Sequence, residues 1–173
     1  MSKKRTKKSE LFSMEIGDKF EFFYKTFTIK NIFDYQWEDS KSVEYEVEYS
    51  GMKKFFGVED DWMLVVTYTE EINIDAIPGN IPQIIGSGNK IPKEIEYKGE
   101  TFYLDDESAG ICTNRVTGEK DEVLCWDYFT NNEAKVLSIE QWDEGEFTAS
   151  YGHSIRESDI RIISSGDMTN RFL

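Results

Sequence analysis

A row of three glutamates in the segment VEYEVEYSG, residues 43–51, stands out among the carboxylates of the sequence. Glu44, Glu46 and Glu48 alternate with valine and tyrosine, so on a strand they would share one face, with neighbours about 7 Å apart. Burying an unpaired carboxylate is costly, and we therefore expect the apolar face to be buried and the glutamates to be solvated. The row is predicted to be an outer strand face that a partner could contact.

Acidic residues also stand beside tryptophan in predicted turns. Two carboxyl groups about 5–9 Å apart across a cleft can hydrolyse a glycosidic bond, and tryptophan beside acid is common in sugar-binding clefts. With 34 acidic residues in the chain, such neighbours also arise by chance. An acid-based hydrolase is therefore an alternative rather than the leading hypothesis. The acidic residues concerned are Glu38, Asp39, Asp60, Asp61, Asp143 and Glu144, beside Trp37, Trp62 and Trp142.

The sequence carries no other catalytic or metal-binding pattern. Cys112, Cys125 and the single histidine, His153, cannot supply the four closely spaced ligands of structural zinc. Cys125 lies in an apolar segment and is expected in the core, whereas His153 is expected in an exposed turn. No phosphate-binding glycine loop, nucleophile elbow or His-Glu-x-x-His is present. We therefore predict no cofactor and no metal.

The formal net charge of −14 is unevenly distributed. The first ten residues carry +4, from Lys3, Lys4, Arg5, Lys7 and Lys8 against one acid, which leaves −18 for the rest. Such an acidic body repels nucleic acid, so no nucleic-acid partner is expected. The basic tail allows a peripheral contact with an anionic membrane, at roughly 1 kcal/mol per basic residue.

The apolar residues indicate where the protein resides. No segment reaches the ~18–20 apolar residues of a membrane span. The first twenty residues lack the apolar run of a signal peptide. Two cysteines in a chain of this size favour a reducing compartment. We therefore expect a cytoplasmic protein with no membrane span.

Alternation of apolar and polar residues predicts strands along most of the chain, and no helical period persists for three turns. For the hairpin that contains the glutamate row, we expect a three-residue loop over 50–52. That loop sets Glu48 opposite Lys54 and Val47 opposite Phe55, which keeps each face uniform. Further strands are predicted in DKFEFFYKTFTIKNI (18–32), EIEYKGETFYLDD (94–106), SAGICTNRV (108–116), EVLCWDYFT (122–130), KVLSIEQW (135–142), EFTASYG (146–152) and DIRIIS (159–164).

The segment 70–93 holds all three prolines together with many isoleucines. It is predicted to be a connector that packs on the body, because so many apolar side chains would not remain in water. The predicted organisation is a basic tail (1–10), a first β half (11–69), this connector, a second β half (94–166) and a C-terminal tail (167–173). Trp62 and Trp126 adjoin apolar runs and are expected in the core, whereas Trp37 and Trp142 precede acids and are expected to be more exposed.

The two halves resemble each other in sequence. YQWEDSKSVEYEVEYSG is similar to EQWDEGEFTASYG, and GDKFEFF is similar to GETFYLD. These similarities predict a weak internal duplication. The predicted fold is all-β, with two related β-meander halves packed as a compact sandwich or as paired small barrels, joined by the Ile/Pro/Gly-rich connector.

The order of short motifs over residues 14–163 resembles the bacterial DUF4178 family. In the second half, the matching positions are Gly99, Tyr103, Ala109, Gly118, Glu119, Leu137, Ser138, Glu140, Glu146 and Gly152. Val43 and Phe55-Phe56 stand where tryptophans are often found in the family, so a role tied to those tryptophans does not transfer. The resemblance implies no established activity or catalytic residues, and it suggests an accessory role in a membrane-stress system of the PspA-like kind.

We therefore expect a non-catalytic binding or adaptor module with a protein partner. The alternatives are a small-ligand-binding β-barrel and an acid-based hydrolase. A flat aromatic–acidic patch would favour the adaptor, a dry apolar cavity the ligand barrel, and a convergent pocket with two close carboxylates the hydrolase. The candidate ligand or partner surface comprises Trp37, Glu38, Glu44, Glu46, Glu48, Trp142, Glu140 and Glu146.

Overall fold

The computed structural model describes residues 10–60 and 63–163, and it confirms the predicted all-β fold. Short helical segments accompany the strands: residues 10–12 are helical, and η1 (Ile74–Ala76), α2 (Ile81–Gly86) and η2 (Glu157–Asp159) follow. The strands are β1 (Lys19–Phe22), β2 (Lys25–Trp37), β3 (Lys41–Tyr49), β4 (Met52–Asp60), β5 (Leu64–Ile72), β6 (Glu94–Tyr97), β7 (Glu100–Asn114), β8 (Lys120–Phe129), β9 (Lys135–Asp143), β10 (Glu146–Ile155) and β11 (Ile160–Ile163).

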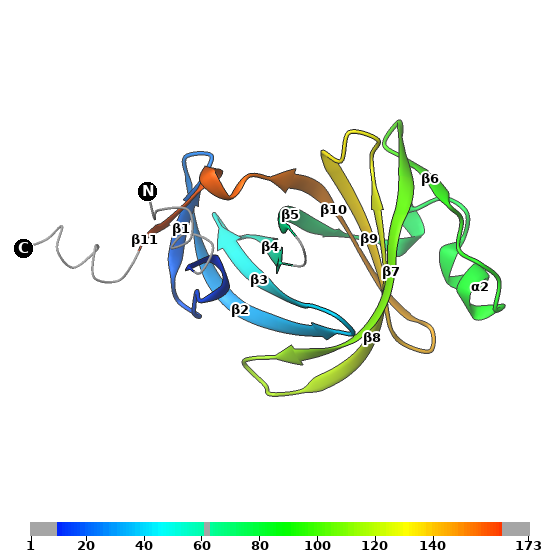
Figure 1. Cartoon of the computed structure of the whole chain (residues 1–173), viewed down its shortest axis with the longest axis horizontal. Helices are drawn as coiled ribbons and strands as arrows, with labels where there is room; N and C mark the ends of the chain where they lie inside the picture. The colour runs from blue at the N-terminus through cyan, green and yellow to red at the C-terminus, as the bar shows by residue number, and fades with distance from the viewer. Residues whose placement is uncertain (1–9, 61–62, 164–173) are drawn as a thin grey trace, which may run out of the picture.

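Eight of these strands close into one barrel (Figure 1). Each half is an antiparallel meander, and the halves meet at two seams, where β2 pairs with β7 and β5 pairs with β10. The order around the barrel is β2-β3-β4-β5-β10-β9-β8-β7. Strands β1 and β11 extend the sheet beyond β2, and β6 extends it beyond β7. The structure is thus a single closed barrel, and not the sandwich or the paired small barrels that the sequence predicted.

Two apolar clusters pack against the outer side of the barrel wall, one in each half. Side chains alternate between the two faces of a strand, so when one set faces the barrel interior the other set faces outward. Val43, Tyr45 and Val47 of β3 belong to the first outer cluster, together with Phe20, Phe56 and their neighbours. The second cluster includes Phe102, Trp126, Tyr128, Leu137 and Ile139. The polar set of each half is left to line the interior.

The connector packs on the second outer cluster, as predicted. Ile77 and Ile81 are buried there, and Ile72, Ile74, Ile84, Ile85 and Ile91 are partly buried against it. The helix α2 begins with proline in its first turn and places Ile81 into this cluster. The first half extends beyond the predicted boundary at residue 69, because β5 runs to Ile72.

The predicted register of the β3–β4 hairpin was wrong. The loop has two residues, Ser50 and Gly51, both with positive φ, which is the turn that best fits the twist of adjoining strands. Val47 therefore lies opposite Lys54. This mixed pair is tolerated because a lysine stem can cover apolar surface while its ammonium reaches outward, here to Glu70 at 2.6 Å.

The tryptophans follow the predicted difference in exposure. Trp126 is 5% exposed in the second cluster, whereas Trp37 and Trp142 are only partly buried. Trp62, the basic residues Lys3, Lys4, Arg5, Lys7 and Lys8, and the predicted C-terminal tail lie outside the described residues.

Both seams of the barrel depend on a glycine. A Cβ at Gly110, where β7 meets β2, would lie 2.5 Å from the Trp37 ring. A Cβ at Gly152, where β10 meets β5, would lie 1.9 Å from the carbonyl oxygen of Tyr68. Contacts this short cannot persist, so each glycine permits the close approach of backbones that closes the barrel.

We expect the substitution Gly152→Ala to lower the free energy of unfolding by about 2–3 kcal/mol, because the backbones at the β5–β10 seam would have to separate. Urea unfolding followed by circular dichroism measures this. The control is Gly86→Ala, where an added Cβ meets nothing within 4 Å and the change should stay within about 0.5 kcal/mol. Equal stability of the two variants would contradict the role assigned to Gly152.

Candidate functional site

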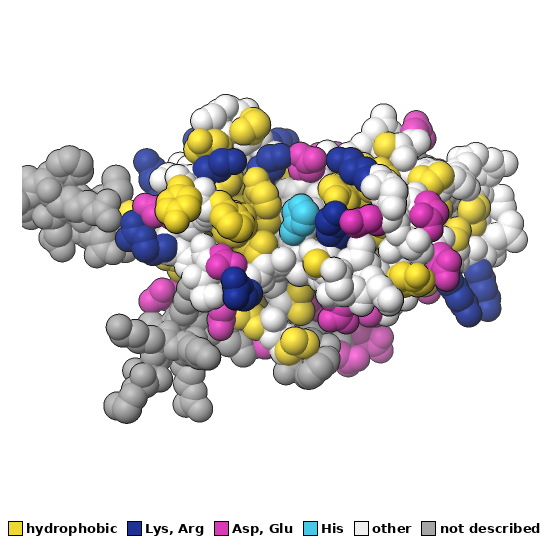
Figure 2. Space-filling model, turned by 90° about the horizontal axis from the view of Figure 1, so that it is seen from above, with side chains coloured by type: hydrophobic (Ala, Val, Ile, Leu, Met, Phe, Trp, Pro, Cys, Tyr) yellow, Lys and Arg dark blue, Asp and Glu magenta, His cyan; other side chains and the backbone are white. Residues whose placement is uncertain are grey.

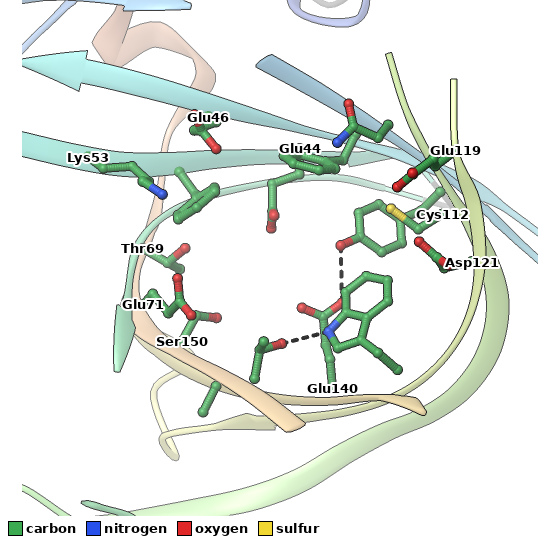
Figure 3. Close-up of a pocket in the computed structure, with 17 residues that line it drawn as sticks. Glu44, Glu46, Lys53, Thr69, Glu71, Cys112, Glu119, Asp121, Glu140 and Ser150 are labelled. Atoms are coloured by element: carbon green, nitrogen blue, oxygen red, sulfur yellow. Dashed lines mark hydrogen bonds between the residues drawn. The ribbon is translucent and has the colours of Figure 1, made fainter. Parts of the chain in front are cut away.

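The barrel encloses a cavity of about 270 Å³ that is open at one end. Every strand of the barrel contributes at least one lining side chain. Figure 3 shows these side chains pointing from opposite walls into a common space. The lining residues that carry chemistry are Glu44, Glu46, Lys53, Glu71, Cys112, Glu119, Asp121 and Glu140, with Phe33, Tyr35, Phe55 and Trp142 as the aromatic wall.

Glu44 and Glu140 face this cavity from β3 and β9 and also line a second, smaller cavity of about 120 Å³. They therefore lie where the two spaces meet. Asp127 of β8 lines the smaller cavity, where it accepts hydrogen bonds from the Ser138 hydroxyl at 2.6 Å and the Cys125 thiol at 3.5 Å. The barrel interior thus brings together three carboxyl groups from three strands.

Burial raises the pKa of all three carboxyl groups, and repulsion from neighbouring carboxylates adds to the effect at Glu44 and Glu140. The pKa of Glu44 rises to about 7, through burial and then the charge of Asp127. The pKa of Glu140 rises to about 8, through burial and then the charge of Glu44. Burial also raises the pKa of Asp127, although its hydrogen bonds oppose this effect. At neutral pH the pair Glu44 and Glu140 therefore retains part of its protons.

The partners of these carboxyl groups differ. Glu140 accepts a hydrogen bond from the Tyr35 hydroxyl at 3.1 Å. No hydrogen bond or ion pair joins Glu44 to another residue of the segments 10–60 and 63–163. Six acidic side chains and one basic side chain, Lys53, line the larger cavity. Its interior is therefore acidic without a matching set of cations.

Aromatic rings form the wall beside the carboxylates. Tyr35 stacks on Trp37 with ring centroids 5.2 Å apart, and Trp142 lies 6.4 Å from Tyr35. The Trp142 indole donates a hydrogen bond to the Thr148 hydroxyl at 2.8 Å, which fixes its ring. Cys112 packs in the same group, and burial raises the pKa of its thiol to about 12. The thiol is therefore protonated at neutral pH and does not add to the negative charge.

The structure brings together five of the eight residues predicted as a ligand or partner surface. Glu44, Glu46, Glu140 and Trp142 line the larger cavity, and Trp37 lines the smaller one. The prediction that the glutamate row is an outer, solvated face was wrong for Glu44 and Glu46, because barrel closure turns that face inward. Glu48 is exposed at the end of β3. Glu38 lines an outer groove beside Trp37, and Glu146 is exposed.

Sequence reasoning missed several residues of the site. Tyr35 lies beyond the predicted strand 18–32, because β2 continues to Trp37. Asp127 is predicted only as part of a strand, and no role in a cavity is predicted for Glu71 or Lys53. The available signal was the alternation itself, since Tyr35, Asp127 and Glu71 each occupy the polar or inward position of a strand. Cys125 is buried as predicted, and His153 is exposed as predicted but lies within β10 rather than in a turn.

In the described segments, no group of three or more His, Cys, Asp or Glu side chains has the arrangement of a metal site. The helices of these segments are all too short or too polar to cross a membrane.

Comparison of the chain with protein-family models agrees with the resemblance seen in its short motifs. The model of the family described as "Domain of unknown function (DUF4178)" matches residues 15–157, which include all eight barrel strands. The chain belongs to this family. An uncharacterized protein of Aquifex aeolicus (strain VF5) is 24% identical over 147 residues, which cover 85% of this chain and 80% of that protein. No solved structure matches the chain.

The raised pKa of Glu44 makes stability depend on pH. The folded protein holds a proton that the unfolded chain releases near pH 4.5, so the free energy of unfolding should fall as pH rises from about 4.5 to about 8. We expect Glu44→Gln to flatten this fall and to stabilise the protein at pH 8 by about 2 kcal/mol. Urea unfolding at pH 5.5 and pH 8 measures the effect.

The matched control is Glu48→Gln on the same strand, which should leave stability within about 0.5 kcal/mol at both pH values because its side chain is exposed. A Glu44→Gln variant that is less stable than the unmodified protein at pH 8 would show that Glu44 has a stabilising partner.

Proposed function

We propose that the protein binds a small organic cation inside its barrel. The observation that carries the proposal is the cluster of Glu44, Glu140 and Asp127, enclosed by the barrel wall without a basic side chain among them. Carboxylates in such a place are costly unless they are protonated or meet a cation. A bound cation would offset the burial that raises their pKa, and it would also relieve the repulsion between Glu44 and Glu140. This is the small-ligand barrel considered from the sequence, with a polar interior in place of a dry one.

The walls of the cavity favour an organic cation. An ammonium group can donate hydrogen bonds to Glu44 and Glu140, and charge-assisted bonds of this kind are stronger than neutral ones. The rings of Tyr35 and Trp142 line the same cavity, and aromatic rings attract ammonium groups. The volume of about 270 Å³ fits a small aliphatic molecule better than a drug-sized one.

Isothermal titration calorimetry with butylammonium, and with butanol as its uncharged counterpart, tests the proposal. We expect butylammonium to bind and butanol not to bind. The double substitution E44Q/E140Q should weaken butylammonium binding at least tenfold, because a hydrogen bond to a charged group is worth roughly 1.5–3 kcal/mol. E48Q should leave binding unchanged.

Binding should strengthen as pH rises through about 7 to 8, because the carboxyl groups must lose their protons to pair with the cation. Butanol binding as tight as butylammonium binding, or no effect of E44Q/E140Q, would contradict a cation site.

An acid-based hydrolase is a second candidate, because Glu44 and Glu140 converge in the cavity, and burial followed by the charge of Glu44 raises the pKa of Glu140. Two carboxyl groups that share a proton can supply an acid and a base. We favour cation binding because Asp127 and Glu46 add negative charge that such a reaction does not need. Cleavage of an aryl glycoside by the unmodified protein, lost in Glu140→Gln, would favour the hydrolase.

The adaptor role in a membrane-stress system stays a prediction. One observation that supports a partner surface is the tip of the β1–β2 hairpin, where Phe23 and Tyr24 are 68% and 103% exposed and both have positive φ. Non-glycine residues seldom adopt this conformation, so two exposed aromatic residues there are unusual. Binding of a cation inside the barrel is compatible with such a surface.

We also infer that the two halves arose by duplication. The hairpin turn at Phe23-Tyr24 and the bulge at Lys30 recur at Lys98-Gly99 and at Asp105, each 75 residues later. Strands of the same rank meet at both seams, β2 with β7 and β5 with β10. The outer cluster and the polar inner face recur in each half, which supports a shared origin of the cavity walls.

A further inference from the structure

A second set of carboxylates lies at the rim of the larger cavity. Glu119 and Asp121, at the β7–β8 hairpin, line the cavity and are exposed. Figure 3 shows both on the wall that also carries Cys112. Neither residue has an ion pair with another described side chain. Lys120, which lies between them, alternates to the outer face of β8. This rim is therefore acidic and faces the same space as Glu44 and Glu140.

The opposite rim differs in charge. Lys53 lines the cavity from β4, between the strands that carry Glu46 and Glu71. Its ammonium offsets part of the negative charge of that wall. The rim at Glu119 and Asp121 has no such basic side chain in the cavity lining. A positive group at the mouth would therefore be attracted to the β7–β8 side.

The sheet register sets the distance between the two acidic sets. Cys125 of β8 pairs with Glu140 of β9, and Asp121 lies four residues earlier on β8, on the same face. At about 3.3 Å per residue, the two carboxylates are separated by about 13 Å along the wall. The wall between them is apolar, formed by Tyr35, Cys112 and Val123 with Phe33 and Trp142 packed against them.

We propose that the ligand is a linear dication with an aliphatic spacer, one ammonium at Glu44 and Glu140 and the other at Glu119 and Asp121. The proposal rests on the function proposed above and names its ligand class. The spacer would lie along the aromatic wall, where apolar surface is buried, while each charged end meets its own pair of carboxylates. A compact monovalent cation would use the inner pair alone.

Calorimetry with pentylamine and with α,ω-diaminoalkanes of increasing length tests this proposal at low ionic strength. We expect affinity to rise with length until the second ammonium reaches the rim, and the best diamine to bind at least fivefold tighter than pentylamine. E119Q/D121N should remove this advantage, so that the best diamine binds this variant no tighter than pentylamine does. Both substitutions are at exposed sites, so the fold should persist, as circular dichroism can verify.

The control is E122Q, because Glu122 is exposed on the same strand and alternates to the opposite face from Asp121. It should retain the full advantage of the diamine. An NMR titration gives an independent readout: the Asp121 amide should shift with the diamine and not with pentylamine.

The proposal is overturned if the diamine advantage survives in E119Q/D121N, if diamines of every length bind no better than pentylamine, or if tetramethylammonium binds better than any diamine. Failure of the cation site itself has a different result, since then neither pentylamine nor any diamine binds and E44Q/E140Q has no effect.

Discussion

Closure of the sheet at two seams determines which face of every strand is inside. Each strand of the barrel has an apolar face and a more polar face, and the apolar faces are taken up by two clusters, one under β1 and β11 and the other under β6 and the connector. Because β2 pairs with β7 and β5 pairs with β10, the polar faces line the interior of the barrel. The molecule therefore has its hydrophobic cores on the outside of a barrel with a polar interior. The space-filling view in Figure 2 shows charged side chains of both signs scattered among hydrophobic and other side chains on the face seen from above.

This arrangement has an electrostatic cost that a purely structural barrel would avoid. Ser138, Cys125 and Tyr35 satisfy oxygen atoms of Asp127 and Glu140, yet none of them neutralises a charge. Hydrophobic residues of similar size at these positions would be less costly. The presence of several carboxylates beside aromatic rings is the physical argument for the proposed ligand role, and the acidic rim extends the same chemistry to the mouth.

Local features of the fold could be predicted from the sequence, whereas closure of the barrel could not. The strands, the connector and the buried Trp126 follow from alternation and composition, because these act on neighbouring residues. The direction of the glutamate row depends on which partner covers Val43, Tyr45 and Val47, and that partner comes from distant parts of the chain. The same limit hid Tyr35, since only closure of the barrel brings it near Glu140. Asp127 lies near Glu140 through the local β8–β9 pairing, and it was missed because the inward direction of that face depends on closure. The hairpin has a two-residue turn at Ser50-Gly51 in place of the predicted three-residue loop. The prediction rested on keeping apolar residues on one strand face, whereas the twist of the hairpin favours the shorter turn.

The glycine at the β2–β7 seam has a consequence for how the two halves can combine. Gly110 occupies the place in β7 that Tyr35 occupies in β2, 75 residues earlier and at the same distance from the turn and bulge. A tyrosine at Gly110 would collide with Trp37. Two copies of the first half could not close this seam, so the two halves are not interchangeable. If two chains exchanged halves, the first half of one chain would have to pair with the second half of the other. Each barrel formed in this way would keep one complete acidic interior.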